Sequence, residues 1–165
     1  MTASLTPGWA HSGGFLSLGD GANAGVDAGG ADRLEILNVL SRYAWSYDER
    51  QLDSLGSVFT EDAVWLGSVK GDFEIEPIRT RDGIVDWLRG HMDSQADQRR
   101  HNIINAVVTE QADRSARVLS YLLLTSATDE GVRVVTTGVY DTELIKDDSG
   151  AWRISRFFGG FDFPF

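Results

Sequence analysis

Two adjoining stretches, SARVLSYLLLTSAT at residues 115–128 and GVRVVTTGVYDTELI at residues 131–145, decide the fold class. Both are long and rich in Val, Leu, Thr and Tyr, a composition that is typical of β-strands. Only two residues separate them, and the dipeptide Glu130-Gly131 is a turn signal. Long strands joined by so short a turn form an antiparallel hairpin.

Similar strand-like stretches lie on both sides of this hairpin, at residues 101–111 and 151–161. Turn signals at residues 113–114 and 148–150 separate them from it. The second half of the chain therefore predicts an antiparallel meander of four strands.

The first half has helical periodicity instead. Leu34, Leu37, Leu40, Tyr43 and Tyr47 recur at helical spacing. Asp32 precedes this run as a predicted N-cap, with a glutamate three residues later.

Two further helices are predicted at residues 52–59 and 82–96, with a strand at residues 63–67 and a hairpin or loop at residues 68–80. Helices followed by an antiparallel sheet give an α+β layer architecture.

The chain of 165 residues is expected to hold one folded domain at residues 32–165, after a flexible Gly/Ala-rich tail at residues 1–31. It has no cysteine and a formal net charge of −10, which argues against nucleic acid or an anionic membrane as a partner. No apolar run approaches the ~20 residues of a membrane span, and the N-terminus lacks the pattern of a secretory signal. A cytoplasmic protein is expected.

Asp48 lies eleven residues after Leu37, about 20° from the direction of Leu37 at 100° per residue. Its carboxylate should therefore face the core, where it needs a partner because an unpaired buried carboxylate is costly. Alternation along the first long strand places four side chains on one face: His101, Ile103, Asn105 and Val107. A face that mixes His and Asn with Ile and Val is typical of a pocket wall.

A carboxylate that accepts a hydrogen bond from one ring nitrogen of a histidine fixes its tautomer and makes the other nitrogen a better base. Asp48 and His101 would then form a general acid–base pair. The alternative is that Asp48 caps the helix end while His101 faces water at a strand edge. Spacing alone leaves both open.

No metal or cofactor is expected. The three histidines, His11, His91 and His101, are far apart and show no metal-ligand spacing. The sequence also has no Gly-rich nucleotide-binding motif after a strand.

Four motifs together resemble the SnoaL-like branch of the nuclear transport factor 2-like superfamily. They are YAWSYD at 43–48, FTEDAVW at 59–65, RHNIIN at 100–105 and GAWRISR at 150–156. Within that branch the chain looks most like scytalone dehydratase, the hexachlorocyclohexane dehydrochlorinase and the bile-acid 7α-dehydratases. The resemblance implies a cystatin-like, cone-shaped α+β barrel, in which a curved, mostly antiparallel sheet surrounds three N-terminal helices and a deep apolar pocket.

The resemblance also implies roles for particular residues. His101 would be the base that removes a proton next to an activating group, and Asp48 would orient it. Tyr47 matches a tyrosine that polarises a substrate carbonyl. Phe161 and Phe163 match a C-terminal segment that closes over bound substrate.

Three more residues are candidates for substrate binding: Tyr43, Trp65 and Asn105. Aromatic residues at helical spacing usually belong to a core, so Tyr43 and Trp65 could equally pack inside the domain.

One departure from scytalone dehydratase matters. That enzyme has a second catalytic histidine on a later strand, and the matching region here, residues 136–138, contains none. A single His–Asp pair fits the dehydrochlorinase and bile-acid enzymes better. The predicted function is a cofactor-independent lyase, of dehydratase type, acting on a small apolar or polycyclic substrate. The alternatives are a polyketide or terpenoid cyclase or isomerase, and a ligand-binding module without chemistry.

A homo-oligomer is expected, with a trimer favoured over a dimer, as in the similar enzymes. One sheet face carries a broad set of apolar side chains: Leu119, Tyr121, Leu123, Val135 and Val139. Such a face exceeds what one layer of helices covers, and exposed apolar sheet tends to be buried between subunits.

Overall fold

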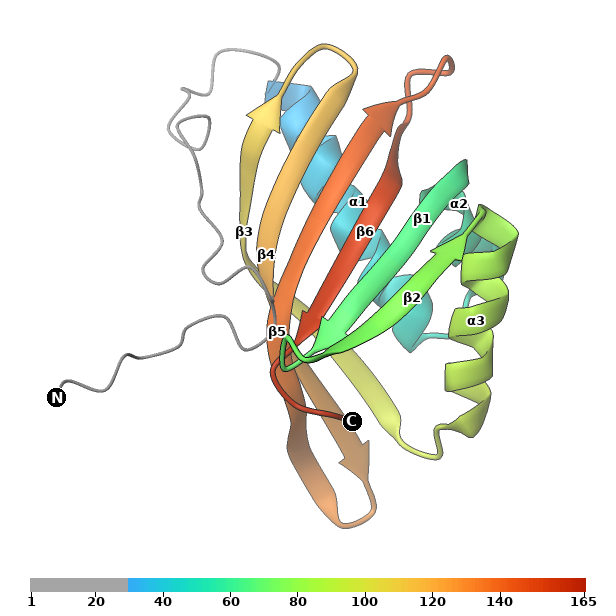
Figure 1. The fold of residues 1–165 in the computed structure, drawn as a ribbon, viewed down its shortest axis with the longest axis vertical. Coiled ribbons are helices and arrows are strands. Elements are labelled where there is room, and N and C mark those ends of the chain that lie inside the picture. The colour runs from blue at the N-terminus through green and yellow to red at the C-terminus, as the bar shows by residue number, and fades with distance from the viewer. Residues whose placement is uncertain (1–29) are drawn as a thin grey trace, which may run out of the picture.

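The computed structural model describes residues 30–165, so the predicted tail lies outside the described residues except for its last two positions. In chain order the elements are α1 (Gly30–Asp48), α2 (Leu52–Ser57), β1 (Phe59–Val69), β2 (Phe73–Arg79), α3 (Arg81–Ser94), β3 (Gln98–Gln111), β4 (Ser115–Thr128), β5 (Gly131–Lys146) and β6 (Trp152–Phe161) (Figure 1). The fold has the predicted α+β class. The predicted order of helices before sheet needs a correction, because the hairpin of β1 and β2 comes between α2 and α3.

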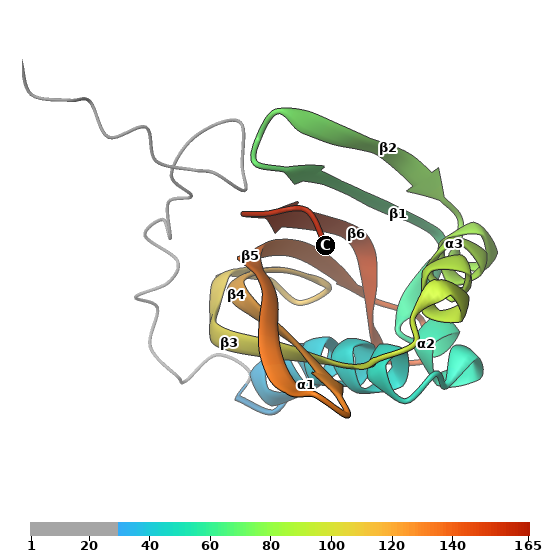
Figure 2. The same cartoon turned by 90° about the horizontal axis from the view of Figure 1, so that it is seen from below.

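All six strands form one sheet in the order β2-β1-β6-β5-β4-β3. Strands β3 to β6 make the predicted antiparallel meander. β1 pairs antiparallel with β2 but parallel with β6, so the sheet is mixed. Figure 2 shows that the sheet is strongly curved and that α1 runs across its open, inner side.

The buried face of α1 is shifted from the predicted one. Its core residues are Ile36, Val39, Leu40, Tyr43 and Tyr47. Leu34 is 69 % exposed, because it lies about 200° around the helix from Ile36. The predicted start of the apolar face at Leu34 is therefore wrong.

Asp32 lies inside α1 and does not act as the predicted N-cap. Its carboxylate accepts hydrogen bonds from Lys146 Nζ at 2.8 Å and from Trp152 Nε1 at 3.0 Å. These bonds attach the first turns of α1 to β5 and β6.

The segment at residues 68–80 is more regular than a loop. β1 continues to Val69, and β2 returns along it with Val69 opposite Phe73 and Trp65 opposite Ile78. Thr80 then caps α3, with its Oγ1 accepting a hydrogen bond from the N–H of Gly83 at 3.2 Å. The hairpin thereby leads α3 back to the inner side of β1.

A β-bulge in β3 changes which residues share a face. Two residues lie between Ile104 and Val107 where the partner strand has one, and Asn105 has a positive φ of 53°. The extra residue shifts the alternation by one, so Val108 packs into the core and Val107 does not. The prediction that Asn105 and Val107 share the face of His101 is therefore wrong.

The outer face of the sheet also differs from expectation at one position. Tyr121 and Val139 face each other across β4 and β5 on the side away from the helices, and Tyr121 is 55 % exposed. Val135 packs against the core instead, because the register shifts next to Leu124. Within residues 30–165, no helix is both long enough and apolar enough to cross a membrane.

Candidate active site

Asp48 and His101 form a two-point contact between α1 and β3. The ring Nδ1 of His101 lies 2.6 Å from Asp48 Oδ1, and the main-chain N–H of His101 donates to Asp48 Oδ2 at 2.8 Å. Only 8 % of the Asp48 side chain and 10 % of the His101 side chain are exposed. A carboxylate accepts hydrogen bonds, so this contact places the ring hydrogen on Nδ1 and leaves Nε2 as an acceptor.

The contact arises from two periodicities. Asp48 is the last residue of α1, one position after the buried Tyr47. His101 lies on the inner face of β3, where it pairs with the buried Leu124 of β4. The structure thus brings together the two residues whose contact the sequence left open.

Tyr47 lies against the same imidazole. The centroids of the Tyr47 and His101 rings are 4.6 Å apart in an edge-on arrangement. Gln95 Nε2 donates a hydrogen bond to the Tyr47 hydroxyl oxygen at 3.2 Å. Burial raises the pKa of Tyr47, and the bond from Gln95 and the charge of Arg99 only partly oppose this effect. The hydroxyl therefore stays protonated at neutral pH, with its hydrogen available to a further acceptor.

The loop between α3 and β3 is fixed to the C-terminal end of α1. Arg50 Nη2 donates to the carbonyl of Gln95 at 2.9 Å, and Gln98 Nε2 donates to the carbonyl of Asp48 at 3.1 Å. This attachment holds Gln95 beside Tyr47.

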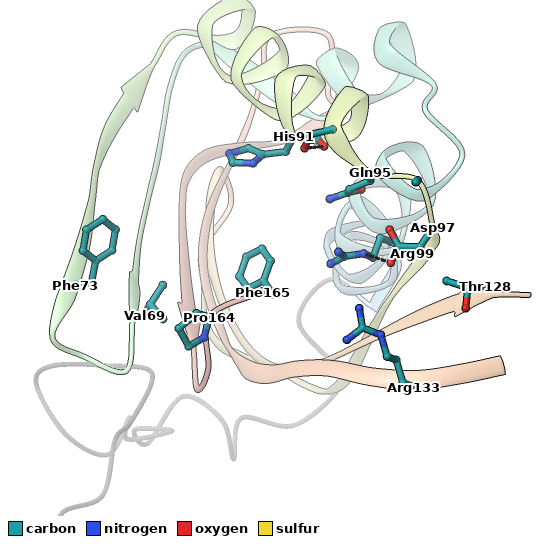
Figure 3. A pocket seen from close by; sticks show the side chains of 12 residues that line it. Val69, Phe73, His91, Gln95, Asp97, Arg99, Thr128, Arg133, Pro164 and Phe165 are labelled. Carbon is teal, nitrogen blue, oxygen red and sulfur yellow. Dashed lines mark hydrogen bonds and ion pairs between the residues drawn. The ribbon is translucent and has the colours of Figure 1, made fainter. Parts of the chain in front are cut away.

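A pocket of about 620 Å³ opens next to this group (Figure 3). Its lining residues are Val69, Phe73, His91, Ser94, Gln95, Ala96, Asp97, Arg99, Thr128, Arg133, Pro164 and Phe165. They come from the β1–β2 hairpin, α3, the loop between α3 and β3, β3, the β4–β5 hairpin and the C-terminal segment. His101 is not among them, and Gln95 is the lining residue that joins the pocket to Tyr47.

Charged groups gather on one wall of this pocket. The Asp97 carboxylate accepts hydrogen bonds from Ser126 Oγ and from Arg99 Nε, the latter at 2.7 Å. Burial raises the pKa of Asp97, but these hydrogen bonds outweigh burial and hold the pKa below its usual value. Burial lowers the pKa of His91. Its ring packs edge-on against Trp87, with the two ring centroids 4.5 Å apart.

Tyr43 and Trp65 lie in the aromatic core. Tyr43 is 3 % exposed and its ring centroid is 4.7 Å from that of Phe157. Trp65 is 2 % exposed, and its ring centroid lies 4.5 Å from that of Trp87. Neither residue lines the pocket of Figure 3, and their part in substrate binding stays a prediction.

Asn105 is exposed at the bulge of β3, away from His101. Its part in substrate binding also stays a prediction.

The C-terminal segment folds back over β5. Phe161 is buried and its ring lies 4.7 Å from that of Phe165. Phe163 is 59 % exposed, and Lys70 Nζ lies 4.7 Å from its ring centroid. Thr136 Oγ1 donates to the carbonyl of Phe163 at 2.9 Å and so holds the C-terminal segment in place. Thr136 belongs to residues 136–138, the region that lacks the second histidine of scytalone dehydratase.

Sequence reasoning missed Gln95, Asp97, Arg99 and Arg133. The predicted strand began at His101, whereas β3 begins at Gln98. An earlier start would have placed Arg99 on the face of His101 by simple alternation. Gln95 and Arg133 carry no such signal, because a helix end and a hairpin bring them to the pocket. Among residues 30–165, no group of three His, Asp or Glu side chains could hold a metal ion.

The family model of the SnoaL-like domain matches residues 30–157, which is most of the chain. The chain belongs to the SnoaL-like family. No curated protein matches this SnoaL-like chain.

Several solved structures share the fold of the SnoaL-like chain. A protein from Catenulispora acidiphila, solved in complex with S-DNPA, is 20 % identical with a TM-score of 0.70, covering 81 % of this chain and 95 % of that one. An NTF2-like protein with a cystatin-like fold from Novosphingobium aromaticivorans is 19 % identical with a TM-score of 0.68, covering 79 % and 82 %. A candidate aromatic ring hydroxylase from Novosphingobium aromaticivorans is 26 % identical with a TM-score of 0.64, covering 81 % and 91 %. The SnoaL-like chain thus has the cystatin-like fold of the NTF2-like superfamily.

Proposed function

We propose that this SnoaL-like domain is a cofactor-independent lyase of dehydratase type, with His101 as its general base. The observation that carries the proposal is the two-point contact of Asp48 with His101. The contact fixes the ring, its tautomer and its direction before any substrate binds. Such positioning is what a general base requires.

In the proposed step, His101 Nε2 takes a proton from a substrate carbon next to a carbonyl group. The C–H electron pair forms the new carbon–carbon double bond, and the hydroxyl group on the neighbouring carbon leaves. The imidazolium returns its proton to that hydroxyl group, which departs as water, and His101 is regenerated. Asp48 stabilises the positive charge on the ring between the two proton transfers.

Tyr47 has a place in the same step. Its oxygen already accepts a hydrogen bond from Gln95, so its own O–H can donate to the substrate carbonyl. A donor at that oxygen stabilises the negative charge that develops as the carbon loses its proton.

The pocket supports a small apolar or aromatic substrate. Its volume of about 620 Å³ is typical of small-molecule sites, and Phe73 and Phe165 line it while remaining largely exposed. The similarity to a candidate aromatic ring hydroxylase supports the same class of substrate.

An isomerase or cyclase is the second candidate. His101 lies against Tyr47, and a single base that returns its proton to another carbon gives isomerisation without loss of water. Mass spectrometry of the product separates the two reactions, because elimination removes one water and isomerisation changes no mass. A ligand-binding module without chemistry is less well supported, because it does not require a contact of 2.6 Å between Asp48 and His101.

The base can be tested without the natural substrate. The probe 5-nitrobenzisoxazole opens its ring when a base removes its carbon-bound proton, and the nitrophenolate product is coloured. The His101→Ala variant should lose ~10²–10⁴ in rate while keeping its folded circular dichroism spectrum. Added imidazole should restore part of that rate. Undiminished activity of the variant, or a wild-type rate no higher than that of free imidazole, would refute the proposal.

We also propose that the domain is a homo-oligomer, with a trimer favoured over a dimer, built on the outer face of the sheet. Tyr121 and Ile104 are neighbours on that face and are 55 % and 43 % exposed. A cytoplasmic location is part of the same proposal.

A further inference from the structure

The lining side chains of the pocket in Figure 3 include more arginines than carboxylates, although the chain as a whole has a formal net charge of −10. Its ionisable lining side chains are Arg99, Arg133, Asp97 and His91. Because burial lowers the pKa of His91, that ring is neutral at neutral pH. Among the lining side chains, two arginines and one aspartate leave one excess positive charge.

The two guanidinium groups still have free donors. Arg99 binds Asp97 through Nε, but its Nη1 is buried and has no hydrogen-bond partner among the described residues. The guanidinium group of Arg133 forms no ion pair or hydrogen bond with any described residue. A buried donor without a partner is costly, so this wall of the pocket suits a ligand that supplies acceptor oxygens.

Opposite these charges the lining is apolar. Phe73 and Val69 lie across the pocket from Arg99 and Arg133 in Figure 3, and Phe165 lies between the two walls. Phe73 is 66 % exposed and Phe165 is 54 % exposed. Large exposed side chains that border a pocket mark a surface for an apolar ligand.

We propose that the pocket binds a monocarboxylate with an aromatic or polycyclic body, and that Arg99 and Arg133 recognise its carboxylate. The planar guanidinium fork matches the two oxygens of a carboxylate. The aromatic body lies against Phe73 and Phe165.

The position of Arg99 extends the proposal to the reaction. Arg99 and His101 are two residues apart on the inner face of β3, so their backbone positions are separated by roughly 6–7 Å. On this arrangement the carboxylate anchors the far end of the substrate, and the carbon that loses its proton lies several bonds from it. The placement of the reacting carbon rests on the proposed function of His101, whereas the binding of the carboxylate does not depend on that function.

The binding test compares 2-naphthoate with its neutral counterpart 2-naphthamide by calorimetric titration at pH 7. The folded wild-type protein should bind 2-naphthoate about tenfold or more tightly than 2-naphthamide. Arg133→Gln should weaken binding of 2-naphthoate by about tenfold or more and leave 2-naphthamide unchanged. Arg99→Lys keeps the positive charge but not the planar guanidinium group. It should weaken binding of 2-naphthoate and leave binding of 2-naphthamide unchanged.

The matched control is Arg114→Gln, which removes one positive charge from a turn far from the pocket, where Arg114 pairs with the exposed Asp148. It should bind 2-naphthoate as the wild type does. Equal affinity of the wild type for both probes would overturn the proposal. An Arg114→Gln variant as weak as Arg133→Gln would also overturn it, because the effect would then be one of net charge.

The His101→Ala variant separates this inference from the proposed function. It should bind 2-naphthoate as the wild type does but should not open 5-nitrobenzisoxazole, which is neutral. If the base test succeeds and the charge preference is absent, the carboxylate site is wrong and the proposed function stands. If the charge preference is present and the base test fails, the carboxylate site stands alone.

Discussion

Asp48 holds His101 by both its ring and its main chain, with one carboxylate oxygen on Nδ1 at 2.6 Å and the other on the main-chain N–H at 2.8 Å. The hydrogen bond to the ring orients the proposed base, and the hydrogen bond to the main chain joins the end of α1 to β3. The same carboxylate therefore serves both stability and the proposed reaction.

Two substitutions of Asp48 should separate these contributions. Asp48→Ala removes both acceptors from a site that is only 8 % exposed, and should lower the free energy of unfolding by about 2–3 kcal/mol. Asp48→Asn keeps one acceptor oxygen and should lower the free energy of unfolding by less than Asp48→Ala does. Both should lose the proposed elimination activity, because neither has a carboxylate to fix the tautomer. Urea denaturation and the rate on 5-nitrobenzisoxazole measure the two effects, and an Asn variant with full activity would contradict this assignment.

The hydroxyl of Tyr47 should resist ionisation. Burial raises its pKa above the ordinary value near 10, so it should remain protonated at a pH where an exposed tyrosine is half ionised. A spectrophotometric titration of the wild type and of Tyr47→Phe should give the same phenolate absorbance at pH 10. A loss of phenolate signal in Tyr47→Phe at that pH would show that the hydroxyl is not shielded as described.

The bulge at Asn105 should tolerate glycine but not a branched residue. Its φ of 53° is in the left-handed region, which glycine adopts freely and asparagine tolerates. Asn105→Val should lower the free energy of unfolding by about 1–2 kcal/mol, whereas Asn105→Gly should be near neutral. Thermal unfolding of the two variants checks this, and equal stability would argue against the bulge.

Asp147 should contribute to stability only above acidic pH. Its carboxylate accepts hydrogen bonds from Ser149, Arg153 and the N–H of Ala151, which hold its pKa well below the usual value. A pKa lowered by folding stabilises the protein above the unfolded value near 4, and this contribution is lost as the pH falls toward the folded value. Asp147→Asn should therefore lower the melting temperature at pH 7 more than at pH 3. An equal decrease at both values would contradict the assignment.

The outer face of the sheet should mediate assembly. Tyr121→Glu places a charge at the centre of the apolar face, and should shift the protein from an oligomer to the 18.1 kDa monomer in light scattering. Arg89→Glu, on the exposed side of α3, is a control that should leave the mass unchanged. A wild-type protein that is already a monomer would disprove the oligomer.

Much of the fold was predictable because two simple periodicities dominate it. The strand at 115–128 was placed with its observed ends, and the 3.6-residue period of α1 placed Asp48 on its inner side. The contact of Asp48 with His101 agrees with that rotation and with alternation along β3, although spacing alone did not decide between this contact and a capping Asp48 with an exposed His101.

The remaining features depend on interactions that no local pattern contains. A single extra residue at Asn105 reversed the alternation beyond it. Gln95 and Arg133 reach the pocket only because α3, β3 and the β4–β5 hairpin converge in space.

The central position of β6 has a consequence for how the chain folds. β6 lies between β1 and β5, so it alone joins the β1–β2 hairpin to the β3–β5 meander. Where β1 pairs with β6, Phe59 of β1 lies opposite Ile154 of β6, and 95 residues separate the two along the chain. Contacts so distant in sequence form late, because a long loop must close before they can form. The six-stranded sheet therefore cannot be completed until residues 152–161 have been synthesised and can pair with both β1 and β5.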